Sequence, residues 1–241
     1  MSTQCRLMID DPAEGSWNMA LDEYLLAHAD ELGPTLRFYA WSNPTLSLGY
    51  FQKYDDRESH PSSLDCDCVR RHSGGGAILH DQEVTYSLIV PTQDRWSKSA
   101  EQLYTKVHEA LIHAYATFGA NCEFSKTVSK EPFLCFQRRA VGDILFQGNK
   151  ITGSAQRRHK GTVLQHGSIL VTQSTHAPEL PGLSDLTETD WDQQELIAKC
   201  AEEIGTILQL EFTKSHELDL TGNVHTIQES KFATESWTKR R

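Results

Sequence analysis

Three consecutive glycines, Gly74, Gly75 and Gly76, constrain this chain more than any other feature of its sequence. They lie between two segments that alternate like strands, CDCVRR before them and AILH after them. Glycine loses more backbone entropy on folding than any other residue, so a triplet within regular structure is costly. A flexible linker would have polar neighbours, whereas this triplet lies between Val69 and Ile78. The pattern therefore predicts a loop whose main chain lies directly against a ligand.

The common phosphate-binding motifs do not account for these glycines. A P-loop requires Gly-Lys followed by Ser or Thr after its spacer, and Ala77-Ile78-Leu79 follow the triplet here. The dinucleotide fingerprint would require glycine or alanine at position 79. The amide groups of such a loop can instead surround an anion or lie against a flat apolar ligand.

The remaining pattern is typical of a mixed α+β domain. Amphipathic helices are predicted at residues 16–28, with Ser16 as N-cap, and at 99–118 and 190–208, the last with Asp190 in a capping box. Segments that alternate like strands surround them, including a hairpin whose turn is Gln147-Gly148-Asn149. Helices placed among hairpin-like strands favour a mixed sheet over a doubly wound parallel one. A length of 241 residues fits one large domain, or one domain with a small appendage.

Charge and composition exclude several classes of protein. The net charge of −10 argues against a general nucleic-acid binder. No apolar run approaches the roughly 20 residues needed to span a membrane, and the N-terminus resembles no secretion signal. The six cysteines form no CxxC pair and do not resemble a disulfide framework or a metal site. We therefore expect a cytoplasmic protein.

Two residues have the chemistry of acyl transfer. Lys150 follows a tight turn, and a lysine on a rigid hairpin can hold its ammonium against an acyl carbonyl, where negative charge develops. Cys135 lies in FLCFQRR, where neighbouring positive charge favours the nucleophilic thiolate. The alternatives are a solvated lysine and a buried structural cysteine. His80 and His166 fit either a core or a surface position, and the absence of a GxSxG motif argues against a serine hydrolase.

Basic residues are concentrated in one short region of this acidic chain. They are either solvated strand ends or a docking patch for an acidic partner or an anionic ligand. The six residues are Arg138, Arg139, Lys150, Arg157, Arg158 and Lys160.

Four motifs together resemble the lipoate–protein ligase and octanoyltransferase family, within the biotin/lipoyl protein ligase superfamily. The resemblance extends from about Trp17 to Leu208. The motifs are NMALDEYLL, WSNPTLSLGYFQ, VRRHSGGGAILHDQEVTYSLIVP and GNKITGSAQRRHKGTVLQHGSILV. Biotin ligases of the superfamily carry a GRGRxGR-type loop, which is absent here.

The resemblance implies a fold and a site. The fold is α+β, a mixed, mostly antiparallel sheet with packed helices, like the catalytic domain of class II synthetases. Residues 1–241 would form a single catalytic domain with the last thirty or so residues as a short appendage and no separate C-terminal accessory domain. The catalytic residues would be Lys150 and, fifteen positions before it, Cys135. The acyl-binding residues would be Arg71, Ser73, Gly74, Gly75, Gly76, His80, Gly153, Ser154, Ala155 and His166.

The resemblance also implies a reaction, attachment of an octanoyl or lipoyl group to a lysine of a lipoyl carrier domain, in an E2 subunit or the glycine cleavage H protein. In cysteine-dependent family members the donor is octanoyl–acyl carrier protein and no cofactor is needed. The alternative is an ATP-dependent ligase that forms lipoyl-adenylate with ATP and Mg. There Lys150 would contact the adenylate, Asp143 would help to place metal or nucleotide, and Cys135 would be incidental. The segment around Asp143 is closer to the ligase pattern, so both stay open, as does a non-catalytic acyl-binding module.

Overall fold

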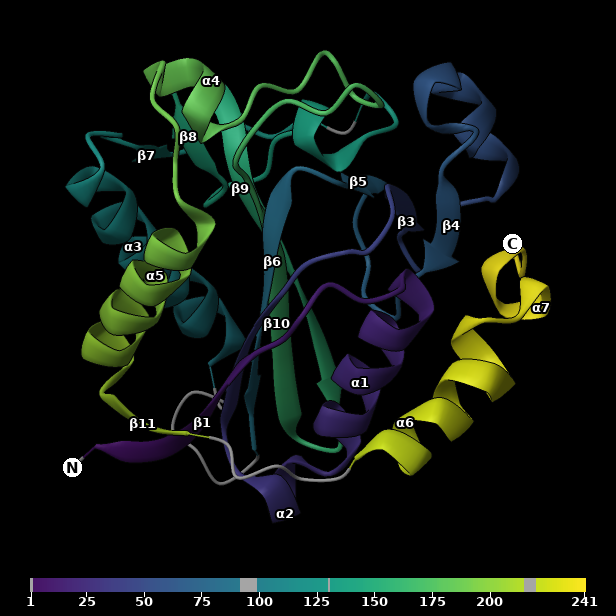
Figure 1. The fold of residues 1–241 in the computed structure, drawn as a ribbon, viewed down its shortest axis with the longest axis horizontal. Coiled ribbons are helices and arrows are strands. Elements are labelled where there is room, and N and C mark those ends of the chain that lie inside the picture. The colour runs from purple at the N-terminus through teal and green to yellow at the C-terminus, as the bar shows by residue number, and fades with distance from the viewer. Residues whose placement is uncertain (1, 92–98, 130, 215–219) are drawn as a thin grey trace.

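An eight-stranded sheet forms the centre of the computed structural model (Figure 1), which describes residues 2–91, 99–129, 131–214 and 220–241. The strand order is β11-β1-β2-β6-β10-β9-β8-β7. Strand β1 runs parallel to β2 and β11, and every other neighbouring pair is antiparallel. The predicted mixed, mostly antiparallel sheet is therefore confirmed. The strands are β1 (Thr3–Ile9), β2 (Thr35–Tyr39), β6 (Glu83–Val90), β7 (Glu123–Phe124), β8 (Ile144–Phe146), β9 (Asn149–His159), β10 (Thr162–Leu170) and β11 (Leu210–Lys214).

A smaller sheet of three strands, in the order β4-β3-β5, lies beside the large one (Figure 1). Its strands are β3 (Thr45–Leu48), β4 (Asp67–Arg70) and β5 (Ile78–His80). The segment between β2 and β3 thus leads from one sheet to the other instead of closing a hairpin. Residues 71–77, hereafter the glycine loop, connect β4 to β5.

Helices cover both faces of the large sheet (Figure 1). On one face lie α3 (Ala100–Thr117) and α5 (Gln193–Leu208), and on the other α1 (Gly15–Ala27) and α6 (Thr221–Ile227). The shorter helical segments are α2 (Ala29–Leu32), α4 (Leu183–Thr187), α7 (Glu235–Thr238), the 3₁₀ turns η1 (Asp55–Ser59), η2 (Pro61–Ser63) and η4 (Cys135–Gln137), and the π-helical turn η5 (Gln228–Phe232).

The two faces of β6 show why polar groups gather beside α1. Val84 and Leu88 point into the apolar core under α3 and α5. The side chains of Thr85 and Ser87 point the other way, as the period of two in a strand requires. There the Ser87 hydroxyl donates to Asp22 of α1 at 2.9 Å, and Thr85 lines a cavity.

Two predicted helix starts are wrong. Ser16 lies inside α1, where its hydroxyl accepts a hydrogen bond from Gln228 at 2.9 Å. Helix α5 is capped by Asp192, whose carboxylate accepts the amide of Glu195, and not by Asp190. In both cases the predicted cap is two residues away from the observed one, Glu14 for α1 and Asp192 for α5, because several polar residues lie near each helix start.

The C-terminal segment is integrated into the fold. Strand β11 pairs with β1 at the edge of the large sheet, and Val224 and Phe232 pack into the apolar cluster of α1. None of the helices in the described ranges has the length and apolar character that crossing a membrane requires.

Candidate active site

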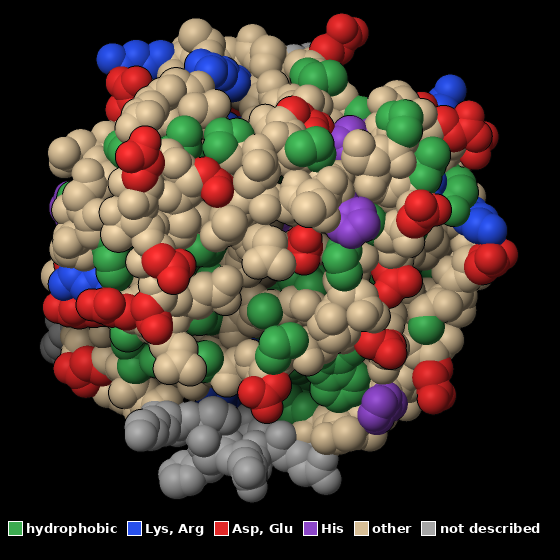
Figure 2. Space-filling view, turned by 45° about the horizontal axis from the view of Figure 1, so that its top comes forward, with side chains coloured by type: hydrophobic (Ala, Val, Ile, Leu, Met, Phe, Trp, Pro, Cys, Tyr) green, Lys and Arg blue, Asp and Glu red, His purple; other side chains and the backbone are tan. Residues whose placement is uncertain are grey.

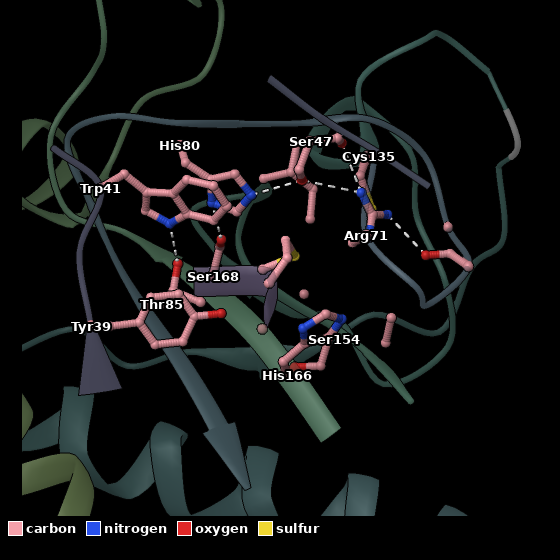
Figure 3. A pocket seen from close by; sticks show the side chains of 17 residues that line it. Tyr39, Trp41, Ser47, Arg71, His80, Thr85, Cys135, Ser154, His166 and Ser168 are labelled. Atoms are coloured by element: carbon pink, nitrogen blue, oxygen red, sulfur yellow. Dashed lines mark hydrogen bonds between the residues drawn. The ribbon is translucent and has the colours of Figure 1, made fainter. Parts of the chain in front are cut away.

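A cavity lies where the small sheet meets the α1 face of the large sheet, with about 450 Å³ of space between the protein atoms, part of it open to solvent. Figure 3 shows Cys135 and Arg71 on one side of it and Tyr39 and Trp41 on the other. Nine of the predicted site residues line the cavity, namely Arg71, Gly74, Gly75, His80, Cys135, Gly153, Ser154, Ala155 and His166. The other three, Ser73, Gly76 and Lys150, lie just behind its wall.

Cys135 and Lys150 are brought together by two different segments. Cys135 begins η4, and its amide donates to the carbonyl of Ala77 at 2.7 Å, which fixes η4 to the glycine loop. Lys150 lies near the start of β9, and its Nζ is 3.7 Å from the Cys135 Sγ and 3.2 Å from the Cys135 carbonyl oxygen. The ammonium therefore points toward the thiol and away from solvent.

A buried carboxylate holds the ammonium in place. Asp143 lies 2.8 Å from the Lys150 Nζ, and both side chains are almost completely buried. The same carboxylate accepts the amide of Ala140 at 2.7 Å and the hydroxyl of Tyr104 at 3.3 Å. With Asp143 and the two atoms of Cys135, the three protons of the ammonium have three acceptors. Sequence reasoning considered Asp143 only as a ligase residue.

Gly153 makes room for this lysine. A Cβ at that position would lie 2.4 Å from the Lys150 Cε and 2.8 Å from its Nζ. Only glycine fits here without displacing the ammonium. The glycine of the motif therefore positions the lysine from behind, in addition to lining the cavity.

The glycine loop is packed against the protein's own main chain. Gly75 has a φ of +97°, which favours glycine. A Cβ at Gly49, just after β3, would lie 2.1 Å from the Gly75 carbonyl oxygen. Close main-chain contact is thus one reason for the glycines. Of the three, Gly74 and Gly75 line the cavity and Gly76 does not.

Arg71 fastens the glycine loop to β3. Its buried guanidinium donates to the carbonyls of Ser47, Gly74 and Gly76 at 2.6–2.8 Å. Burial lowers the pKa of Arg71 to about 10, so the group is still charged at neutral pH. The side chain therefore shapes the wall of the cavity.

His80 forms part of the cavity floor as a neutral ring. It stacks on Trp41, with the ring centroids 3.9 Å apart, and hydrogen bonds to Ser47 at 2.8 Å and to Glu83 at 3.0 Å. Burial lowers the pKa of His80 below its usual value, despite the opposing effect of Glu83.

His166 links the cavity to a buried charge network. One ring nitrogen contacts the Ser73 hydroxyl at 2.5 Å, and the other lies 3.5 Å from Asp22. Burial alone would raise the pKa of Asp22, but the hydrogen bond to His166 and the charge of Arg37 hold it at about 2. Sequence reasoning missed this network, although a carboxylate on the apolar face of α1 was a signal for it.

Ser154 is fixed by another buried histidine, His108, which the sequence analysis did not single out. Its hydroxyl contacts His108 at 2.7 Å and the Tyr86 hydroxyl at 2.6 Å. Burial lowers the pKa of His108 to about 4, so the ring is neutral. Among the described residues, no three His, Cys, Asp or Glu side chains are arranged as a metal site requires.

Comparison with known proteins identifies the family. The model of the lipoyl protein ligase A/B catalytic domain matches residues 14–204. The octanoyltransferase LipM of Oceanobacillus iheyensis is 39% identical over 165 residues, which are 66% of this chain and 60% of the relative, so the chain spans about three fifths of its length.

Solved structures show the same fold. Lipoate-protein ligase A bound with ATP superposes with a TM-score of 0.80 at 19% identity, covering 98% of each chain. A bipartite lipoate protein ligase of Thermoplasma acidophilum, solved in a study with its E2 lipoyl domain, gives 0.76 at 19% identity, covering 98% of this chain and 96% of that one. The resemblance drawn from the four motifs is confirmed, and this chain belongs to the lipoyl protein ligase A/B catalytic domain family.

Proposed function

We propose that this protein transfers an octanoyl group, or a lipoyl group, to the target lysine of lipoyl carrier domains through an acyl-enzyme on Cys135. The observation that carries the proposal is the thiol of Cys135 at the cavity wall, 3.7 Å from the buried ammonium of Lys150. The similarity to an octanoyltransferase supports the same chemistry.

In the first step the Cys135 thiolate attacks the carbonyl of an octanoyl thioester on acyl carrier protein. The bond between the Cys135 sulfur and the acyl carbon forms and the carbonyl oxygen becomes an oxyanion. As the oxyanion collapses the bond to the donor sulfur breaks, and the donor thiolate takes up a proton from solvent, which replaces the one that Cys135 released to solvent on ionising. The ammonium of Lys150 stabilises the thiolate before attack through a charge-assisted hydrogen bond. The sulfur no longer carries charge once it has attacked the carbonyl carbon. The ammonium can then donate the same hydrogen bond to the oxyanion, which stabilises the transition state by about 3–4 kcal/mol.

In the second step the neutral amine of the carrier lysine attacks the thioester on Cys135. The C–N bond forms, the C–S bond breaks, and the amine's proton returns to the sulfur. An amide is more stable than a thioester, so the transfer proceeds without ATP, metal or another cofactor. The partners are acyl carrier protein as donor and, as acceptor, the lipoyl domain of an E2 subunit or the H protein.

The cavity suits a saturated acyl chain. Met19, Ile78 and Ala155 contribute apolar surface, and Trp41 with the neutral His80 forms a flat floor. A mostly apolar cavity with a few placed polar groups is the usual design of small-molecule sites. We propose the cytoplasm as the compartment, because all six cysteines are free thiols.

The alternative, an ATP-dependent ligase that forms lipoyl-adenylate, keeps the same cavity and Lys150. In that ligase, Asp143 was expected to help to place metal or nucleotide. In the structure its carboxylate is already paired with Lys150 at 2.8 Å. That pairing favours the transferase, and transfer from free lipoate that requires Mg-ATP would favour the ligase. Tight binding of octanoate without turnover on either donor would instead indicate an acyl-binding module.

Intact-mass spectrometry tests the proposal directly. After mixing with octanoyl–acyl carrier protein, the protein should gain one octanoyl group, and Cys135→Ala should neither gain it nor modify a lipoyl domain. The matched control is Cys122→Ala, because this half-buried thiol lies outside the cavity. Full transfer by Cys135→Ala would exclude covalent catalysis.

A further inference from the structure

Residues beyond the family match bring positive charge to the rim of the cavity. The match ends at residue 204, and the later segment returns to the small sheet. The Trp237 indole donates to the carbonyl of Arg70 at 2.8 Å, and the Arg70 guanidinium donates to the carbonyl of Thr238 at 3.0 Å. The main-chain oxygen of Arg241 accepts the amide of Tyr54 at 2.8 Å. These bonds fix residues 237–241 beside β4, immediately before the glycine loop (Figure 1).

Three arginines surround two aromatic rings there, and we name this set the basic–aromatic patch: Tyr50, Phe51, Arg157, Arg240 and Arg241. The Arg240 guanidinium lies 4.4 Å from the Tyr50 ring centre, Arg241 lies 5.4 Å from Phe51, and Arg157 lies 5.8 Å from Tyr50. Phe51 is 69% exposed. Within the described ranges, no carboxylate forms an ion pair with any of these arginines.

Two neighbouring lysines, unlike these three arginines, do form ion pairs with carboxylates. Lys231 is paired with Glu23, and Lys239 with Glu235. The chain has a net charge of −10, and Figure 2 shows acidic side chains spread over one face with most basic ones toward its margins. Unpaired guanidinium groups are therefore a local reversal of the overall charge, which favours an anionic partner at this place.

The patch borders the cavity through the glycine loop. Phe51 is the neighbour that a Cβ at Gly74 would meet, at 3.9 Å, and Gly74 lines the cavity together with Cys135. The guanidinium of Arg157 donates to the carbonyl of His72 in the same loop at 3.1 Å. A substrate arm that crosses the patch therefore reaches the cavity over the glycine loop.

We propose that the basic–aromatic patch binds the acyl donor, an acidic carrier protein whose octanoyl thioester is attached through a phosphopantetheine arm. This inference rests on the proposed function. The arm of such a donor carries a phosphodiester, whereas the lysine arm of the acceptor carries no anion. Planar guanidinium groups match phosphate oxygens in geometry and charge, and the exposed ring of Phe51 offers apolar contact to the rest of the arm.

Charge reversal with a matched control tests the inference. In Arg240→Glu/Arg241→Glu, the rate of acyl-enzyme formation from octanoyl–acyl carrier protein should fall by about tenfold or more at low salt, and less at high salt. The rate with octanoyl-pantetheine, which lacks the phosphodiester and the carrier, is measured on the same variant as the reference. Lys106→Glu/Lys126→Glu makes the same charge change near α3 and β7 and should leave both rates unchanged.

The outcomes separate this inference from the proposed function. If the unmodified protein forms no acyl-enzyme from either donor, the proposed function is wrong. If it does, and the arginine variant reacts equally with the carrier-bound donor, the patch is not the donor site. Equal losses on both donors, or a loss confined to transfer onto the lipoyl domain, also overturn the inference. Arg240→Gln/Arg241→Gln provides the same test with less disturbance of the segment if charge reversal loosens it.

Discussion

Replacing Lys150 by methionine should stop acyl transfer and also destabilise the fold, and a second substitution can separate these effects. The side chains of Lys150 and Asp143 are 4% and 2% exposed and lie 2.8 Å apart. Methionine keeps the length and the apolar stem of lysine but removes the charge. The carboxylate of Asp143 would then be buried with only neutral partners.

The magnitude follows from the contacts that remain. Removing one partner of a buried ion pair costs about 3–5 kcal/mol of the free energy of unfolding. The amide of Ala140 and the hydroxyl of Tyr104 still donate to Asp143, so we expect the lower end, about 3 kcal/mol. Asp143→Asn alone should cost a similar amount, because it leaves the ammonium buried without its counter-charge. The double variant carries neither charge and should recover about 2 kcal/mol or more of the loss.

Urea denaturation at pH 7 measures all four members of this cycle, and intact-mass spectrometry with octanoyl–acyl carrier protein measures their acylation. We expect Lys150→Met/Asp143→Asn to be nearly as stable as the unmodified protein and inactive. Loss of activity in a stable protein would assign the ammonium to the reaction itself. The reasoning is refuted if Lys150→Met alone is as stable as the unmodified protein, or if the double variant forms the acyl-enzyme at the normal rate.

Two further substitutions probe the glycine behind Lys150 and a buried histidine of the glycine loop. Gly153→Ala places a Cβ 2.4 Å from the Lys150 Cε. We therefore expect acyl-enzyme formation to slow by about tenfold or more, while circular dichroism shows that the protein stays folded. An unchanged rate would show that the lysine has room to move. Burial lowers the pKa of His72 from 6.5 to about 3, so at pH 5 the unfolded chain binds a proton there and the folded protein does not. The free energy of unfolding should therefore fall by about 2 kcal/mol between pH 7 and pH 5 at this residue, and His72→Leu should show a correspondingly smaller fall in urea titrations at the two pH values.

Local patterns were enough to predict most elements and to single out Cys135 and Lys150 as candidates for acyl transfer. The helices α3 and α5 have a clear apolar stripe in the sequence, and the hairpin of β8 and β9 is signalled by Gly148 in the turn between them. The position of Cys135 relative to Lys150 came from the resemblance, and the structure places the two side chains in contact. The division of the strands into two sheets was not predictable in this way, because it depends on pairing between segments far apart in the chain.

The same limit applies to charge. Lys150 was grouped with Arg138 and Arg157 in a basic region because they are close in sequence. In the structure Lys150 is buried against Asp143, and Arg138 donates to the main-chain carbonyl of Pro132. The arginine that lies near Arg157 in the structure is Arg240, because both guanidinium groups contact the ring of Tyr50. Such a grouping requires the fold of the C-terminal segment, which no local pattern encodes.

The glycines that were expected to make room for a ligand also make room for the proposed catalytic pair. The Gly75 carbonyl lies against Gly49, which brings the glycine loop onto the small sheet, and the next part of the loop, Ala77, accepts the amide of Cys135. Gly153 admits the side chain of Lys150. Cys135 and Lys150 are therefore held at their separation by main-chain contacts from two other motifs. A side chain at Gly49 or Gly153 would therefore disturb the thiol–ammonium geometry even if the cavity itself kept its shape, so under the proposed mechanism these motifs are coupled through catalysis as well as through acyl binding.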